Sequence, residues 1–305
     1  MAKPAFSTFA VRTLSGAVLF VLVVGATLLS PYSFAALLLV ICIGAVHEFY
    51  DLAGKAGAEP QRMAGVTTAA LIVAANFLLA SGFGGMPMGV VLACAFVLFF
   101  ALFAAELYRK RERPLLNIAA TITGIVYVAF PLSMMCYLAV FPFGEQISAG
   151  GCSGGLLHTG ARIEAYKPWL ILCYIFLVWL NDIGAYVFGV AFGRHRLFER
   201  ISPKKSWEGL FGGLLVAIGG GILMGWLLTG SGGDARINMA FWGGLGAVTV
   251  VSGVMGDLVE SMFKRSVGVK DSGNIMPGHG GMLDRFDAML YSAPFVFLYF
   301  YIFAA

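Results

Sequence analysis

The stretch GDLVESMFKRSVGVKDSGNIMPGHGGMLDRFD, from Gly256 to Asp287, joins two long apolar segments near the C-terminus. It holds five carboxylates, four basic side chains and one histidine, in a chain that is otherwise mostly apolar. Charged residues at membrane depth are rare and are retained mainly for function. The stretch is therefore where we look first for a site, and the apolar segments around it indicate the fold.

Helical spacing groups the acids of this stretch. Four polar residues fall at i, i+3, i+4 and i+7 and so share one helix face: Asp257, Glu260, Ser261 and Lys264. Asp284 and Asp287 are again three residues apart and open the next apolar segment. The loop between Lys264 and Asp284, which we call the signature loop, is rich in glycine and basic residues. Two acidic helix ends joined by such a loop predict a site for metal ions and phosphate.

The same residues resemble the signature of phosphatidate cytidylyltransferases, also called CDP-diacylglycerol synthases. The spacing agrees throughout at Ser261, Lys264, Arg265, Lys270, Asp271, 277–281, Asp284, Arg285 and Asp287. Met276 stands where the family carries Leu, Ile or Phe. Because Met is a flexible apolar residue, this departure changes little.

Two earlier segments extend the resemblance. The sequence SPKKSWEG, from Ser202 to Gly209, resembles the family's SPxKTxEG segment, with Ser206 in place of threonine, so that the hydroxyl is kept. The pair Asn181-Asp182 resembles the acidic position of the preceding helix. The resemblance is specific from Leu180 to Asp287, and before that only the composition agrees.

The resemblance implies transfer of a cytidylyl group from CTP to phosphatidate, with release of pyrophosphate. It also implies Mg²⁺, a second, monovalent cation such as K⁺, and a homodimer in the lipid bilayer, with no nucleic-acid partner. The expected metal ligands are Asp182, Asp257, Asp284 and Asp287. The expected catalytic residues are Lys264, Arg265, Lys270, Asp271, His279 and Arg285. The expected substrate-binding residues are Ser202, Lys204, Lys205, Ser206, Glu208, Ser261, Gly278, Gly280 and Gly281.

Composition indicates an integral membrane protein. Of 305 residues, 59% are hydrophobic and only 12% are charged, and the mean hydropathy is +0.86. Soluble domains carry about 25% charged residues. We expect an all-α, polytopic protein that forms a single integral membrane domain over residues 1–305, with its catalytic region at 181–287.

Nine segments are long and apolar enough to cross the hydrocarbon core. Their approximate bounds are Leu14–Leu29, Tyr32–Tyr50, Met63–Ser81, Pro87–Tyr108, Leu115–Phe141, Pro168–Phe192, Trp207–Leu228, Ile237–Phe263 and Phe286–Phe303. The remaining sequence reads as short turns, a polar loop at 142–167 and a strongly basic loop at 193–206.

The distribution of Lys and Arg predicts the orientation. With nine spans, all but three of the 20 basic residues fall on one side, the exceptions being Arg162, Lys167 and Arg236. By the positive-inside rule, the basic side is cytoplasmic. We therefore expect a cytoplasmic N-terminus, an outer C-terminus and a cytoplasmic signature loop in the inner (plasma) membrane.

The expected chemistry needs little proton transfer. A phosphate monoester has a second pKa of about 6, so phosphatidate is largely ionised at neutral pH. The obstacle is the approach of one anion to another, and catalysis should consist of positioning and charge neutralisation. Divalent metal on carboxylates and Lys or Arg on phosphate oxygens would supply both.

Several residues also have structural interpretations. Glu48, Asp51 and Glu106 lie near span ends and are interpreted as helix caps or interfacial anchors. Glu260 is either a metal ligand or the i+4 partner of Lys264. His279 is interpreted as a phosphate contact, with a metal ligand and a loop hydrogen bond as alternatives.

Two other functions stay open. Another CTP-dependent lipid enzyme, such as a polyprenol or phytol kinase or an ether-lipid cytidylyltransferase, would differ in acceptor or tail. An alcohol acceptor is not ionised and would need a base. An ion-coupled transporter would place acids near the midplane of several helices, whereas here they cluster at the predicted cytoplasmic ends.

Overall fold

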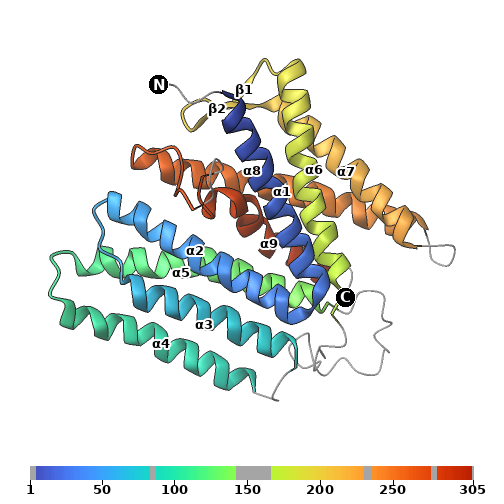
Figure 1. The fold of residues 1–305 in the computed structure, drawn as a ribbon. Coiled ribbons are helices and arrows are strands. Elements are labelled where there is room, and N and C mark those ends of the chain that lie inside the picture. Colours follow the sequence, from blue (N-terminus) through green and yellow to red (C-terminus); the bar gives the residue numbers. More distant parts are fainter. Residues whose placement is uncertain (1–4, 83–86, 142–165, 230–234, 276–279, 304–305) are drawn as a thin grey trace. The chain divides into compact units, whose positions relative to one another are not determined.

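The computed structural model describes residues 5–82, 87–141, 166–229, 235–275 and 280–303 (Figure 1). These residues form nine helices and one β-hairpin. The chain folds as two compact units. The first comprises Met1–Pro168 and Ser266–Phe286, and the second comprises Trp169–Arg265 and Asp287–Ala305. The expected single membrane domain stays a prediction.

The first unit is a bundle of helices. Its elements are α1 (Ala5–Leu29), α2 (Pro31–Lys55), α3 (Arg62–Ala80), α4 (Met88–Arg109), α5 (Pro114–Ala139) and the first turn of α9 (Leu283–Phe303). Helices α2, α3, α4 and α5 run side by side (Figure 1). The fully buried Tyr50 lies among α2, α3 and α5, and its hydroxyl donates to the carbonyl of Thr121 over 2.9 Å. Gly65 and Gly124 leave room for this ring, because a Cβ at either position would overlap it.

The second unit contains α6 (Pro168–Phe192), α7 (Trp207–Thr229), α8 (Ala235–Ser266) and the rest of α9. Its helices approach closely at glycines. A Cβ on Gly184 of α6 would lie 2.9 Å from the carbonyl oxygen of Gly212 on α7. A Cβ on Gly246 of α8 would lie 2.5 Å from the carbonyl oxygen of Ala217, also on α7. Small residues of this kind let helix backbones pack tightly within a membrane.

The nine predicted spans all coincide with helices. Among the described residues, eight of these helices are long and apolar enough to cross a membrane, judged by length and composition. The apolar part of α1, Thr13–Leu29, is shorter. The chain is thus a multi-pass membrane protein, while the ninth span and the orientation stay predictions. The predicted polar loop falls mostly on residues 142–165, outside the described residues.

The described part of the chain is all-helical, as expected, apart from one short hairpin. The basic loop at 193–206 forms an antiparallel hairpin of β1 (Arg196–Phe198) and β2 (Ser202–Ser206). The amide of Trp207 donates to the carbonyl of His195 over 3.0 Å and closes the open end of the hairpin. Strands are recognised in a sequence by alternating apolar residues, and this mostly charged segment lacks that alternation. Backbone pairing rather than side-chain burial holds the hairpin together, so its strands could not be predicted.

Candidate functional site

Three carboxylates converge in the second unit. Asp257 and Glu260 lie one turn apart on α8, and Asp287 lies on α9. One oxygen of each lies within 4.8 Å of the others. The Glu260 side chain is fully buried, and the other two are half-buried. Helical spacing correctly predicted that Asp257 and Glu260 share a face, and the fold adds Asp287 from the neighbouring helix.

Gly256 allows this convergence. A Cβ at this position would lie 2.5 Å from Cβ of Tyr291 and 2.7 Å from the carbonyl oxygen of Asp287. Real Cβ atoms do not approach other atoms this closely. A larger residue would therefore push α8 and α9 apart at the level of the acids, next to Asp257.

Two lysines bind the acids of this cluster. Lys205 at the end of β2 extends its Nζ to within 2.5 Å of Asp257 Oδ2. Lys264 forms an ion pair with Glu260, as the i+4 spacing predicted. Ser261 donates from Oγ to Asp257 Oδ1 over 3.2 Å. Three carboxylates thus face two ammonium groups.

The cluster suits a divalent cation. Mg²⁺ takes oxygen ligands at about 2.0–2.1 Å and is usually held by one or two carboxylates, with water and substrate phosphates completing its octahedron. The oxygens of Asp257, Glu260 and Asp287 are of the right kind and lie within 4.8 Å of one another. The sequence predicts Asp257 and Asp287 as ligands and leaves two roles open for Glu260. The geometry favours Glu260 as a third donor.

Asp284 binds its own loop in the first unit. Its Oδ2 accepts hydrogen bonds from the amides of Ser272 (2.9 Å) and Gly281 (2.8 Å) and lies 3.0 Å from Ser272 Oγ. Gly280 precedes this turn with a positive φ of 84°, which glycine adopts without strain. The converging carboxylates of the described residues do not include Asp284. Its role as a metal ligand stays a prediction.

The other signature residues of the first unit are mostly exposed. Lys270, Asp271 and Arg285 are all exposed. On α8 in the second unit, Arg265 is likewise exposed. Gly278 and His279 lie outside the described residues, so their expected roles stay predictions.

The SPKKSWEG segment shapes the junction of the hairpin and α7. Ser206 is buried, and its Oγ accepts from the amide of Gly209 over 3.2 Å, as a helix N-cap does. Glu208 accepts from the amide of His195 at 3.2 Å, and its Oε1 lies 2.6 Å from His195 Nδ1. Ser202 is half-buried and Lys204 is exposed. Ser206 and Glu208 thus have structural partners, and their substrate contacts stay predictions.

Asp182 is not one of the three converging carboxylates. Its side chain is exposed on α6, 3.5 Å from the amide nitrogen of the buried Asn181. A Cβ on Gly213 would overlap Oδ1 of Asn181, which shows how closely α7 packs here. Asp182 is absent from the converging carboxylates of the described residues, and its metal role also stays a prediction.

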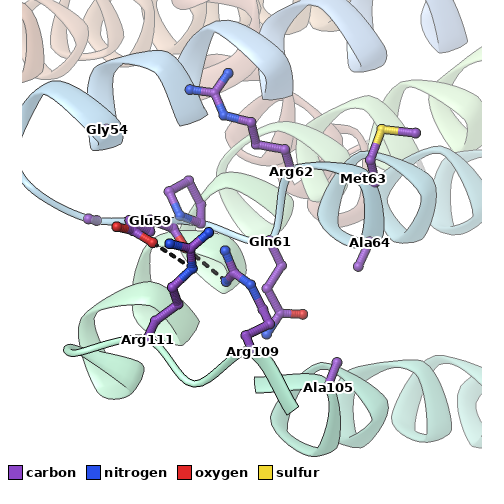
Figure 2. Close-up of a pocket in the computed structure, with 11 residues that line it drawn as sticks. Gly54, Glu59, Gln61, Arg62, Met63, Ala64, Ala105, Arg109 and Arg111 are labelled. Atoms are coloured by element: carbon purple, nitrogen blue, oxygen red, sulfur yellow. Dashed lines mark hydrogen bonds and ion pairs between the residues drawn. The ribbon is translucent and has the colours of Figure 1, made fainter. Parts of the chain in front are cut away.

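The first unit contains a pocket of about 720 Å³, lined by residues between Gly54 and Arg111 (Figure 2). These residues are distant in the sequence from the signature residues. Its cations are already paired. Arg109 donates to the Glu59 carbonyl (2.9 Å) and to Glu106 (2.8 Å), and Arg111 pairs with the Glu59 carboxylate (2.9 Å). Arg62 pairs with Asp51. Since none of the predicted site residues lines it, this pocket is not our candidate for the nucleotide site.

Glu48 is a residue whose role sequence reasoning missed. It was interpreted as a helix cap or interfacial anchor, yet it is 2% exposed and binds the signature loop of the first unit. It does cap a helix, but that helix is α9 rather than its own. The sequence shows only that Glu48 is an acid within an apolar segment. Its hydrogen-bond partners lie far away in the sequence, so residue spacing could not identify them.

Comparison with known proteins identifies the family of this chain. The chain is similar to phosphatidate cytidylyltransferases of Haemophilus influenzae (43% identity over 144 residues) and Staphylococcus epidermidis (47% over 126 residues). These alignments cover 46% and 41% of this chain, and 48% and 46% of the relatives, so the matched part is about half of each relative's length. A family model described as "Cytidylyltransferase family" matches residues 10–303. Because that match spans nearly all of the sequence, the chain belongs to the cytidylyltransferase family.

Proposed function

We propose that this protein transfers the cytidylyl group of CTP to phosphatidate, making CDP-diacylglycerol and pyrophosphate. The observation that carries the proposal is the cluster of Asp257, Glu260 and Asp287, with Lys205 and Lys264 on its edge. Family membership and the names of the similar bacterial proteins support it.

The chemistry follows from charge. The phosphate of phosphatidate is the nucleophile and is ionised at neutral pH, so no strong base has to remove a proton from it. Its oxygen forms a bond to the α-phosphorus of CTP, and the bond from that phosphorus to the pyrophosphate oxygen breaks. Lys and Arg side chains would hold the phosphate oxygens in line and offset their mutual repulsion.

We assign the divalent cation, Mg²⁺, to the oxygens of Asp257, Glu260 and Asp287, and keep Asp284 and Asp182 as further candidates. A bound divalent cation supplies charge stabilisation to phosphate oxygens. Lys205 and Lys264 lie beside the same carboxylates and would meet those phosphates directly. The monovalent cation and the homodimer implied by the family stay proposals.

Replacing Arg265 or Lys270 by Ala should lower turnover strongly, because each removes an exposed positive charge that we assign to the substrate phosphates. The loss of one such contact raises the activation free energy by about 2 to 4 kcal/mol. Lys264→Ala should also lower thermal stability, since it leaves the buried Glu260 without its ion pair. Turnover and apparent melting temperature would be measured on purified protein in detergent.

Arg111→Ala is the matched control for that series. Arg111 forms an exposed ion pair with Glu59, and such pairs contribute about 0–1 kcal/mol. We expect near-normal turnover. Equal losses in Arg111→Ala and Lys270→Ala would mean that basic residues act through membrane assembly, and the phosphate assignment would be abandoned.

We also propose that the protein resides in the plasma membrane, with nine spans and the signature loop in the cytoplasm. A reporter fused after Ala305 should then be active only outside the cytoplasm. A reporter inserted between Arg109 and Arg113 should behave as cytoplasmic, because that linker belongs to the basic side. A cytoplasmic C-terminus would contradict the nine-span topology.

The test of the function is release of pyrophosphate from CTP by the purified protein, with phosphatidate as acceptor, with and without Mg²⁺. We expect release of pyrophosphate only when CTP, phosphatidate and Mg²⁺ are all present. Release of CDP rather than pyrophosphate with a polyprenol or phytol, and no reaction with phosphatidate, would identify a lipid kinase instead. No consumption of CTP with any acceptor would overturn the proposal.

A further inference from the structure

A buried carboxylate from α2 anchors the signature loop of the first unit. Glu48 is 2% exposed, and the residues that it binds lie more than 220 positions later in the chain. Within the described part of the chain, no lysine or arginine pairs with it. A buried charge without a cationic partner is unfavourable unless hydrogen bonds satisfy it. The hydrogen bonds of Glu48 to the loop therefore explain how a carboxylate is tolerated at this buried position.

Both carboxylate oxygens of Glu48 accept hydrogen bonds from the loop. The amide of Met282 donates to Oε1 over 2.8 Å, and the amide of Leu283 donates to Oε2 over 2.8 Å. Leu283 is the first residue of α9. The first N–H groups of a helix have no partner within it and carry partial positive charge. Glu48 therefore fixes the point at which α9 begins.

Ser272 connects Glu48 to Asp284. Ser272 Oγ lies 2.8 Å from Glu48 Oε2 and 3.0 Å from Asp284 Oδ2. A hydroxyl has a single proton, so Ser272 donates to one of the two carboxylates at a time. The Ser272 amide also donates to Asp284 over 2.9 Å. The orientation of the Asp284 carboxylate is thereby coupled to that of Glu48.

Two glycines of the loop make room for this carboxylate. A Cβ on Gly273 would overlap Oε1 of Glu48, and a Cβ on Gly281 would overlap its Oε2 and Oγ of Ser272. The loop backbone thus closes around Glu48 on two sides. The sequence predicts Gly281 as a substrate-binding residue. A side chain at this position would also clash with Glu48 and Ser272.

We propose that Glu48 is the positioning residue of the signature loop. It holds the start of α9 and, through Ser272, sets the carboxylate of Asp284. Lys270 and Asp271 extend outward from the same loop, and Arg285 extends from the first turn of α9. This inference rests on the proposed function, because these are the loop residues that we assign to cytidylyl transfer. Glu48 touches no substrate in this scheme and acts only through the loop.

The test compares Glu48→Gln with Glu106→Gln. An amide at position 48 keeps the size but replaces one acceptor oxygen by an NH₂ group, which faces N–H donors. Glu106 is a buried acid of α4 (4% exposed) that accepts from Gln61, Asn117 and Arg109. Among the described residues, it makes no hydrogen bond or ion pair with the signature loop. Both variants lose a buried carboxylate, but only the first loosens the signature loop.

We expect Glu48→Gln to lower kcat about 10- to 100-fold, the range seen when a partner that orients a functional carboxylate is lost. Glu106→Gln should lower thermal stability and leave the kcat of the folded protein within about twofold. Ser272→Ala should also lower kcat, and combining it with Glu48→Gln should add little, since both act on one network. An unchanged kcat in folded Glu48→Gln protein would overturn the proposal.

Hydrogen exchange in detergent gives a readout that does not depend on activity. Peptides containing Ser272, Met282 and Leu283 should exchange faster in Glu48→Gln than in the unmodified protein, and Glu106→Gln should leave them unchanged. If the unmodified protein fails to consume CTP while these peptides still respond, the proposed function fails and the positioning role stands. If the peptides do not respond, the positioning role fails whatever the activity.

Discussion

Replacing Asp287 by Asn is expected to abolish Mg²⁺-dependent cytidylyl transfer, with turnover falling by at least about 10²- to 10³-fold. Asn keeps the size of Asp but is not a carboxylate, so the cluster with Asp257 and Glu260 keeps only two of its three carboxylate ligands. Carboxylates are the ligands that hold Mg²⁺ in proteins. The loss should appear as a failure to respond to added Mg²⁺ as well as a lower rate.

The same substitution should not lower the stability of the protein. Three carboxylates with oxygens within 4.8 Å repel one another, and Asp287→Asn removes part of that repulsion. We expect an apparent melting temperature equal to or above that of the unmodified protein without metal. A ligand that binds only the folded state raises the melting temperature, so the rise with MgCl₂ should be lost in the variant.

The control for this experiment is Asp51→Asn. Asp51 is a half-exposed acid of the first unit that pairs with Arg62 over 2.5 Å. It should keep normal turnover and the normal response to MgCl₂. Near-normal turnover with unchanged Mg²⁺ dependence in Asp287→Asn would mean that the cation is held elsewhere, and Asp284 and Asp182 would be the next candidates.

Gly256→Ala is expected to remove activity through packing alone. The added methyl group would lie 2.5 Å from Cβ of Tyr291 and 2.7 Å from the carbonyl oxygen of Asp287, so α8 and α9 must separate. Overpacking of this kind destabilises a protein by about 1–3 kcal/mol. Separation also moves Asp257 away from Asp287, so both the apparent melting temperature and the affinity for Mg²⁺ should fall.

Gly253 provides a matched control one turn earlier on α8. A Cβ there would lie 3.6 Å from Cβ of Ala288, which is an ordinary van der Waals contact. Alanine is also favoured over glycine within a helix by about 1 kcal/mol. Gly253→Ala should therefore be neutral or stabilising and keep full turnover. If Gly256→Ala behaved in the same way, close packing at Gly256 would not be what brings the acids together.

Much of the site on α8 could be predicted from local spacing. Helical periodicity placed Asp257, Glu260 and Lys264 on one face, and the ion pair between Glu260 and Lys264 follows from an i+4 separation. The signature residues also identified the family that the comparison establishes. These inferences succeed because each depends on residues within a few turns of one another, or on matched positions.

Contacts between residues far apart in the sequence could be identified only from the tertiary structure. Lys205 and Asp257 are 52 positions apart, and no pattern in the sequence pairs them. Glu48 looked like an interfacial acid of α2 until the structure placed it against Ser272 and Leu283. Asp284, which stays a predicted metal ligand, also holds the loop through Ser272 and Gly281. Which acid meets which donor depends on helix packing.

The sequence by itself determined the membrane-spanning helices, because a bilayer requires apolar segments about 20 residues long whose backbone groups are satisfied within the helix. It also determined the chemical character of the site, since carboxylates and basic residues gather in few places in this chain. Only the tertiary structure decided which acids converge and which support the loop. Those choices depend on how closely helices pack at residues such as Gly256, and on which buried donors a carboxylate must satisfy, as Glu48 does.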